Sequence, residues 1–582
     1  MLYTVELRPR VERLAAQSLG RPVAIGGLHV AWGRRTVVTA SDIVLGNIAW
    51  GSEPEMVRIG RLAATLDLAA VLHGVLRYEH LRLDNVRVLL ERRADGAPNW
   101  KLGRTPARLP NGGLALVPAN RTQFPSLLDF VLTKGTVVYR NAGRPDITMA
   151  ARDLRIAASD ETAPASLKLD GTYNGAGVQM SATTASFAVM RDASVPFATV
   201  LDLVADGATA RFDGTLREPL DFDGAVGALQ LKSIDLGKLL AKFGSDEPLA
   251  VPLTLNGGLL RNGDDWTLEK VSGRLATSDF AGALALREGG RGQPDLVRLD
   301  LASPLLDVAA LLAGRGAAAG ADTSLGFVAS PGTLFDGRIV ARAAVWNRLR
   351  LEDFTLAGHM APGLLQIGTL TFTIARGKAE AQLQAKAAAG GARIVASAPV
   401  TGAELGALLQ MSGGSAANLA GKLDGRLQLD TQGNTLQAAL GASRGQAVLA
   451  MQGGSMTRDL LEKVSTDLRA LFRPGQGNVP VVCLLAVANL KDGIATIAPL
   501  RLRTPDTILA GGGGIDLRRE TLDLVIAAEG GGPFALGLPL RLGGEVASPS
   551  IGPYAGVAPR PPGAPALVPD LLSMVSASPC RF

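Results

Sequence analysis

Apolar and polar residues alternate along much of this chain, in short runs that are interrupted by glycine. In 379–387, alanine and leucine alternate with glutamate, glutamine and lysine, and the same period of two returns in 423–430 and 522–526. A period of two predicts β-strands with one apolar face and one polar face. Helical patterns are few and short, so the apolar faces need something other than a layer of helices to cover them.

Composition agrees with a large strand-rich protein. The chain has 582 residues, of which 70 are glycine, well above the usual share of about 7%. Glycine supplies turns and bulges between strands. Several glycines, such as Gly171, Gly214 and Gly425, stand at apolar positions of strands, where each is expected to leave a notch in the apolar face. Leucine, valine, isoleucine and alanine are too frequent for a disordered chain.

Several function classes find no support in the sequence. The net charge is only +6, and no cluster of basic and aromatic residues indicates a nucleic-acid partner. The four histidines have no metal-ligand spacing, and the glycine run 511–514 lacks the Lys-Ser/Thr of a phosphate-binding loop. Carboxylates such as Asp213 lie at turns or at polar strand positions. We therefore expect no metal, no cofactor and no enzymatic activity.

The two cysteines, Cys483 and Cys580, leave two readings open. One disulfide would suit an oxidising compartment and would tie the C-terminal tail to the last strands, whereas two separate thiols fit the spacing equally well. Short helices are expected at 10–19, 234–243, 305–312, 403–409, 457–472 and 570–575. Changes of strand parity near Gly60 and at Asp84-Asn85 predict a bulge or bend.

Five stretches resemble segments of the AsmA family of envelope proteins, in the order in which that family has them. They are 19–30, 42–56, 96–101, 480–483 with 491–495, and 504–507 with 514–524. These matches cover roughly the first 100 and the last 130 residues. Between them, the chain is similar to the family only in its strand pattern.

The resemblance implies both a fold and a function. Members of the family are anchored in the inner membrane by an N-terminal helix and extend a long, bent β-groove into the periplasm, and their larger relatives look like bridges for phospholipids. The expected partners are therefore phospholipid or another acyl lipid, the inner membrane and outer-membrane components. The anchor helix is absent from this chain, so we expect that its start lies upstream or was trimmed.

The expected fold is mainly β: a long, twisted antiparallel sheet curled into an elongated hydrophobic groove, with short helices at its ends and as interruptions. Six segments are expected. They are an N-terminal helix or the end of a missing anchor (1–20), an AsmA-like β/α cap (21–102), a loop (103–123), a repetitive β-groove (124–455), an AsmA-like C-terminal region with a helix and closing strands (456–554), and a proline-rich tail (555–582).

The resemblance implies an AsmA-like protein that binds or conducts phospholipid acyl chains in the periplasm and supports outer-membrane lipid homeostasis and assembly, and a hydrophobic groove would suit acyl chains. Each buried methylene contributes about 0.8 kcal/mol, so a tail of about 16 carbons could gain on the order of 10 kcal/mol before binding costs. The candidate groove residues are Leu370, Phe372, Ile374, Leu383, Leu427 and Leu429, and the alternative for them is an ordinary core. The alternative function is a scaffold for outer-membrane protein assembly through sheet-edge pairing.

Overall fold

The chain folds into two compact units of β-strands. The computed structural model describes residues 4–33, 35–67, 77–93, 95–100, 102, 121, 124–141, 146–241, 249–289, 293–313, 325, 333–346, 349–411, 419–464, 476–529, 539–545, 548–554 and 566–581. Unit 1 comprises Met1–Ala276 and Ala283–Gln293, and unit 2 comprises Thr277–Gly282 and Pro294–Phe582. Strand β15 (Ser278–Arg287) has residues in both units.

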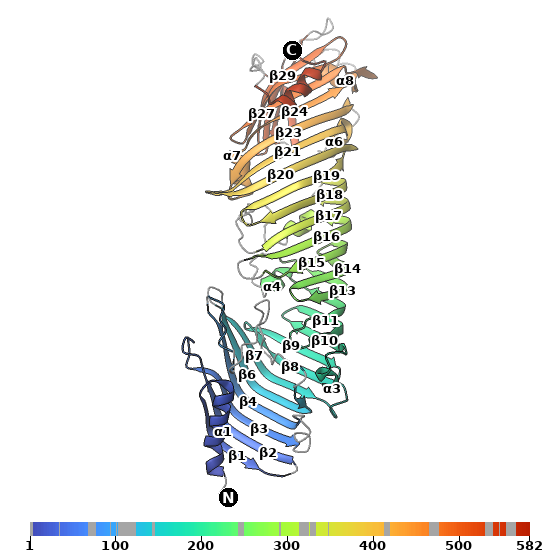
Figure 1. The fold of residues 1–582 in the computed structure, drawn as a ribbon. Coiled ribbons are helices and arrows are strands. Elements are labelled where there is room, and N and C mark those ends of the chain that lie inside the picture. The colour runs from blue at the N-terminus through green and yellow to red at the C-terminus, as the bar shows by residue number, and fades with distance from the viewer. Residues whose placement is uncertain are drawn as a thin grey trace. The chain divides into compact units, whose positions relative to one another are not determined.

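Unit 1 holds the elements from α1 to β14 (Figure 1). Its helices are α1 (Thr4–Leu19), α3 (Phe187–Arg191) and α4 (Leu236–Ala241). Its strands are β1 (Val23–Ala31), β2 (Arg35–Gly46), β3 (Glu55–Asp67), β4 (Arg77–Arg92), β5 (Ser126–Leu127), β6 (Asp129–Asn141), β7 (Ile147–Ala157), β8 (Ala165–Tyr173), β9 (Ala176–Thr184), β10 (Phe197–Ala205), β11 (Ala208–Leu216), β12 (Val226–Ser233), β13 (Leu253–Asn262) and β14 (Asp265–Leu275).

Unit 2 holds the elements from β16 to α9. Its helices are α5 (Val308–Ala313), α6 (Leu405–Met411), α7 (Leu436–Ala442), α8 (Arg458–Val464) and α9 (Pro569–Ala577). Its strands are β16 (Asp295–Asp307), β17 (Thr333–Trp346), β18 (Leu349–Ala361), β19 (Leu364–Ile374), β20 (Gly377–Ala388), β21 (Gly391–Glu404), β22 (Leu419–Ala420), β23 (Lys422–Gly433), β24 (Arg444–Gln452), β25 (Ser455–Thr457), β26 (Asn478–Pro480), β27 (Cys483–Lys491), β28 (Ile494–Arg503), β29 (Ile508–Asp516), β30 (Thr521–Glu529), β31 (Leu540–Glu545) and β32 (Ser548–Pro553).

The mainly β fold that the sequence predicts is confirmed, but the sheet is mixed rather than wholly antiparallel. Of the described strands, 29 belong to one open sheet, and β22, β25 and β26 form a small second one. In unit 1, β4 pairs in parallel with β5 and β6, and in unit 2, β16 pairs in parallel with β17. Parallel neighbours need a long crossover instead of a tight turn, and the segments 93–128 and 308–332 supply this length.

A row of apolar side chains crosses the strands of unit 1 without a break. Directly paired residues continue it from β1 to β14, and most of them are half-buried. The row consists of Leu28, Ala40, Leu62, Leu83, Leu132, Leu154, Leu169, Met180, Leu203, Ala210, Leu231, Leu255 and Gly273. Side chains on one face of a strand recur at every second residue, so strands with a common register carry one apolar face from neighbour to neighbour.

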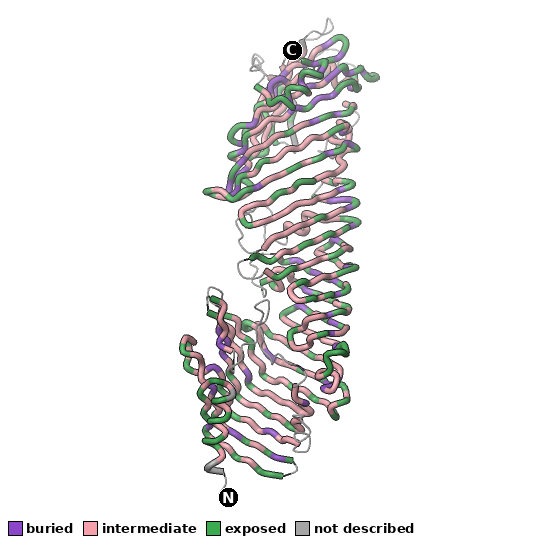
Figure 2. The backbone as a smooth tube through the Cα atoms, viewed as in Figure 1, coloured by how far each residue is buried: buried purple, intermediate pink, exposed green. Residues whose placement is uncertain are grey.

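Unit 2 repeats this arrangement on its own strands from β16 to β30. The row consists of Leu299, Gly337, Gly358, Ile367, Leu383, Ala396, Leu429, Gly445, Leu490, Ala495, Ile515 and Leu522. We call the face of unit 2 that carries this row the apolar face, and the opposite one the polar face. Figure 2 shows that half-buried and exposed positions dominate the strands, whereas fully buried ones are few.

The change of parity in the first strands follows a bend in the backbone. Asn85 has a left-handed conformation, with φ +55°. A Cβ on Gly60 would lie 3.1 Å from the Cβ of Asn85 on the neighbouring strand, which places the two residues side by side. A left-handed residue interrupts the regular alternation, so Val86 and Leu83 both continue apolar rows. The predicted bend is confirmed at Asp84-Asn85 and beside Gly60.

The short helices largely follow their sequence signals, with shifted ends. Helix α1 is longer than the predicted 10–19, and α4, α5, α6 and α9 overlap 234–243, 305–312, 403–409 and 570–575. The helix predicted over 457–472 begins at Arg458, because Thr457 still belongs to β25 and its hydroxyl accepts from the N–H of Leu460 at 3.3 Å. Residues 465–472 lie outside the described residues.

Candidate functional site

The six residues predicted as groove liners lie together on the apolar face of unit 2. Leu383 and Leu429 both pair with Ala396 of β21, one from each side. Leu370 pairs with Ala381, two residues before Leu383, so Leu370, Phe372 and Ile374 share the face of Leu383. Leu427 precedes Leu429 by two residues and joins the same face.

The six side chains differ in how far the protein itself covers them. Leu370 and Phe372 pack against a core around Phe354, and Leu383 packs against a second core that contains Ala385. Ile374 and Leu429 are half-buried, whereas Leu427 is 38% exposed. The first three therefore also help to hold the fold, and Leu427 offers the most accessible apolar surface of the set.

The helices of unit 2 cover only the margins of the apolar face around β23. At the start of β23, Leu423 packs in a core with Leu405 of α6 and with Leu460 and Leu461 of α8. At its end, the hydroxyl of Thr431 donates a hydrogen bond to the carbonyl of Ala439 in α7. Helices of seven residues are about 10 Å long and span about two strands. Between these margins, the described helices leave Leu427 uncovered.

The sequence did not single out Leu449, which widens this uncovered region. Leu449 of β24 is 43% exposed and pairs with Gly425, next along the face to the pair of Leu427 with Ala447. A Cβ on Gly425 would come within 2.9 Å of the Cδ2 of Leu449, so the glycine makes room for that leucine. The alternation of 445–451 could have indicated Leu449, but its exposure depends on helices that pack elsewhere.

A cleft of about 1070 Å³ lies on the polar face of the same strands. Val568, just before α9, lines the cleft, and its N–H donates to the Oε1 of Gln446 at 3.1 Å. Gln446 pairs with Gln428, which alternates with Leu427 and Leu429. Leu383 and Leu429 are also part of the lining, but their side chains therefore extend from the opposite face of the sheet.

Most of the charged residues in and beside this polar cleft are paired. Arg393 donates to both carboxylate oxygens of Asp430, at 3.0 and 2.6 Å. The Arg393 guanidinium holds the pKa of the Asp430 carboxyl below its ordinary value, and the charge of Arg444 acts in the same direction. Arg444 itself forms an ion pair with Asp492 at 3.3 Å. Lys491, which also lines the cleft, has no ion pair among the described contacts, so the cleft carries one cation beyond these pairs.

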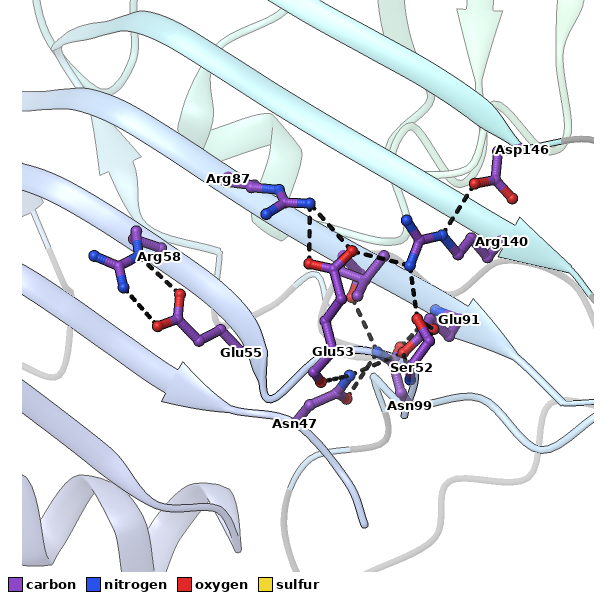
Figure 3. A network of polar contacts seen from close by, with 11 residues as sticks. Asn47, Ser52, Glu53, Glu55, Arg58, Arg87, Glu91, Asn99, Arg140 and Asp146 are labelled. Carbon is purple, nitrogen blue, oxygen red and sulfur yellow. Dashed lines mark hydrogen bonds and ion pairs between the residues drawn. The ribbon is translucent and has the colours of Figure 1, made fainter. Parts of the chain in front are cut away.

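Two asparagines from the stretches with family resemblance form a buried structural network in unit 1 (Figure 3). Asn99 is fully buried; it donates to the Oδ1 of Asn47 at 3.0 Å and accepts from the N–H of Glu91 at 2.8 Å. Asn47 donates to Glu91 at 2.8 Å and to the carbonyl of Glu53 at 2.9 Å. Arg140 joins from β6, with an ion pair to Glu53 at 2.9 Å. These contacts fix the turns around residues 47–54 and 96–100.

The two cysteines form a disulfide, so the first of the two readings is confirmed. Cys483 starts β27, and Cys580 follows α9. Both belong to a core in which Leu571 and Val575 of α9 pack on Val448 and Leu485 of the sheet. The bond therefore fastens α9 against the polar side of β24 and β27, at one end of the polar cleft.

No helix among the described residues has the length and apolarity needed to cross a membrane.

Comparison with known proteins finds similarity to one family. Residues 336–500 match the family model of the AsmA family. Over 632 aligned residues, the chain is 24% identical to the AsmA family protein YhjG of Escherichia coli (strain K12), covering 94% of this chain and 89% of YhjG. No solved structure was found to match. The first two findings confirm the resemblance to the AsmA family and support an envelope-associated protein.

Proposed function

We propose that this protein binds phospholipid acyl chains on its apolar face and conducts them along it in the periplasm, in support of outer-membrane lipid homeostasis. The observation that carries the proposal is the unbroken apolar row from β16 to β30, which the described helices cover only at its margins. An acyl chain that lies along such a row exchanges one set of apolar contacts for the next, so it can move with little change in free energy.

Three further features agree with this function. Ala396 carries only a methyl group between Leu383 and Leu429 in the row and leaves space beside these leucines. The disulfide between Cys483 and Cys580 is typical of an oxidising compartment such as the periplasm. The matched family is one of envelope proteins. Attachment of this protein to the inner membrane is part of the same proposal.

Scaffolding by sheet-edge pairing has less support from the described edges. Strand β32 contains Pro549 and Pro553, which cannot donate a backbone hydrogen bond to a further strand. At the other edge, α1 lies against β1: Glu12 accepts from the N–H of Ile25 at 2.8 Å, and Arg8 donates to the carbonyl of Gly26 at 2.9 Å. Both edges are thus poorly suited to strand addition.

Photocrosslinking from two adjacent positions tests the lipid proposal. Leu427 or Gln428 is replaced by the photoreactive p-benzoylphenylalanine in cells, and mass spectrometry identifies the lipid bound to each variant after irradiation. We expect phospholipid adducts at position 427 and few at 428, because the two side chains lie on opposite faces. Equal labelling at both positions, or labelling at neither in folded protein, contradicts the proposal.

A further inference from the structure

Two rows of polar side chains line the polar cleft on the face away from the apolar row. The first crosses five strands in direct register and consists of Gln382, Ser397, Gln428, Gln446 and Asn489. The second begins with Gln366 and Gln384 and continues to Val395 and Asp430. All of these residues line the 1070 Å³ cleft. No other use for them follows from lipid binding on the opposite face.

Uncharged hydrogen-bonding groups predominate in this cleft, beside the charged Asp430, Arg444 and Lys491. Elsewhere on that face, the charged pair of Arg541 with Asp523 joins two strands at 2.7 Å. Within the described contacts, the side chains of Gln382, Gln384 and Gln428 have no hydrogen-bond partner in the protein. Each amide offers two donors and an acceptor, at intervals of about 4.8 Å from strand to strand.

We propose that the polar cleft binds a neutral oligosaccharide. Sugar hydroxyl groups both donate and accept hydrogen bonds, as the amides of Gln384 and Gln428 do. Val395, 46% exposed in the middle of the second row, offers an apolar contact for the C–H face of a sugar ring. The volume lies at the upper end of the range for small-molecule sites, which suits several linked sugar units.

The C-terminal segment completes the binding site. Gln446 donates to the carbonyl of Ala566 at 2.8 Å and accepts from Val568, so this glutamine holds the wall of the cleft rather than the ligand. The disulfide and the packing of Leu571 keep α9 beside that wall. The wall is thus fixed before a ligand binds, which lowers the entropic cost of binding.

Other ligand chemistries fit the cleft less well. A strongly anionic ligand would find only Lys491 as a cation without a described partner, because Arg444 is paired with Asp492, and Arg393 with Asp430. An extended peptide could not add to the sheet here, because β20, β21, β23 and β24 each have hydrogen-bonded neighbours on both sides.

Calorimetric titration of the whole protein tests this inference independently of lipid binding. The probes are the neutral maltohexaose, cellohexaose and N-acetylchitohexaose, with dextran sulfate as the anionic comparison. We expect at least one of these sugars to bind the parent protein. Its affinity for the double variant Gln384→Leu/Gln428→Leu should be lower by about tenfold or more, because two hydrogen bonds are lost. The variant Gln230→Leu, at an exposed position of β12 in unit 1, serves as the matched control and should bind like the parent. If the leucine pair fails to fold, Gln384→Ala/Gln428→Ala replaces it.

Three results would overturn the inference. The first is no binding of any probe at millimolar concentration, and the second is binding that the double substitution of Gln384 and Gln428 leaves unchanged. The third is binding of dextran sulfate in preference to the neutral sugars. None of them bears on photocrosslinking at Leu427, so the two proposals can fail separately.

Discussion

A negative charge at Leu427 should separate an open apolar face from a closed core. Leu427 is 38% exposed, so the leucine gains roughly 60% of the ~1.5–3 kcal/mol that full burial provides, or about 1–2 kcal/mol. In Leu427→Glu this gain is lost, but the carboxylate can reach water and carries no large burial penalty. We therefore expect urea unfolding to show a loss of about 1–2 kcal/mol in a protein that remains folded.

The same variant should lose lipid while the fold persists. A charge on the row opposes the passage of an acyl chain, so phospholipid recovered with the purified protein should fall, whereas the opposite-face control Gln428→Glu should keep it. Leu485 is fully buried, and Leu485→Glu sets the scale of a closed core, with a cost of about 3–5 kcal/mol or more. If Leu427→Glu unfolds like Leu485→Glu, position 427 belongs to a closed core and the reasoning is refuted.

Two other substitutions test local features of unit 1. In Gly214→Ala, the new Cβ would lie 2.3 Å from the carbonyl oxygen of Val226 and 2.6 Å from the Cα of Gly227. We therefore expect urea unfolding to show a loss of about 1–3 kcal/mol in stability. The control Gly177→Ala, whose Cβ would have nothing within 4 Å, should be nearly neutral. Equal effects of the two would contradict the close approach. Glu161 pairs with Arg77 at 2.8 Å, and this contact lowers the pKa of the carboxyl, so the stabilisation is present at neutral pH and is lost as the pH falls through the lowered pKa. Glu161→Gln should thus be about 1–2 kcal/mol less stable at pH 7, with the difference shrinking as the pH falls below the ordinary glutamate pKa of about 4.3; a gap that stays constant down to the lowest pH at which the protein remains folded would exclude this pair as its cause.

The strand pattern predicted the faces of the sheet because side-chain direction is a local property. Leu427 and Leu429 could be assigned to one face of their strand from their spacing alone, and the register through Ala396 places Leu383 on the same face. The parallel junction of β16 with β17 could not be predicted in this way, since a period of two says nothing of which strand is the neighbour or in which direction it runs.

Features that depend on contacts between distant residues also escaped prediction. Gly214 was expected to leave a notch, but its missing side chain allows the backbone of Val226 and Gly227 to approach. The polar cleft needs the register of Gln382, Ser397 and Gln428 on three strands, together with Val568 from the C-terminal segment. The pairing of Cys483 with Cys580 closes a separation of 97 residues, which spacing alone leaves undecided.

The direct register of the apolar rows has a consequence for how proteins of this kind can change in length. Because each strand passes the row to the next, as Leu383 does to Ala396 and Ala396 to Leu429, adding or removing an antiparallel hairpin would preserve both the chain direction and the row. A single strand would reverse the direction of all that follows. Where neighbouring strands are antiparallel, lengths in such a lineage should therefore differ by pairs of strands, so that the sheet grows in steps of about 10 Å without redesign of the remainder.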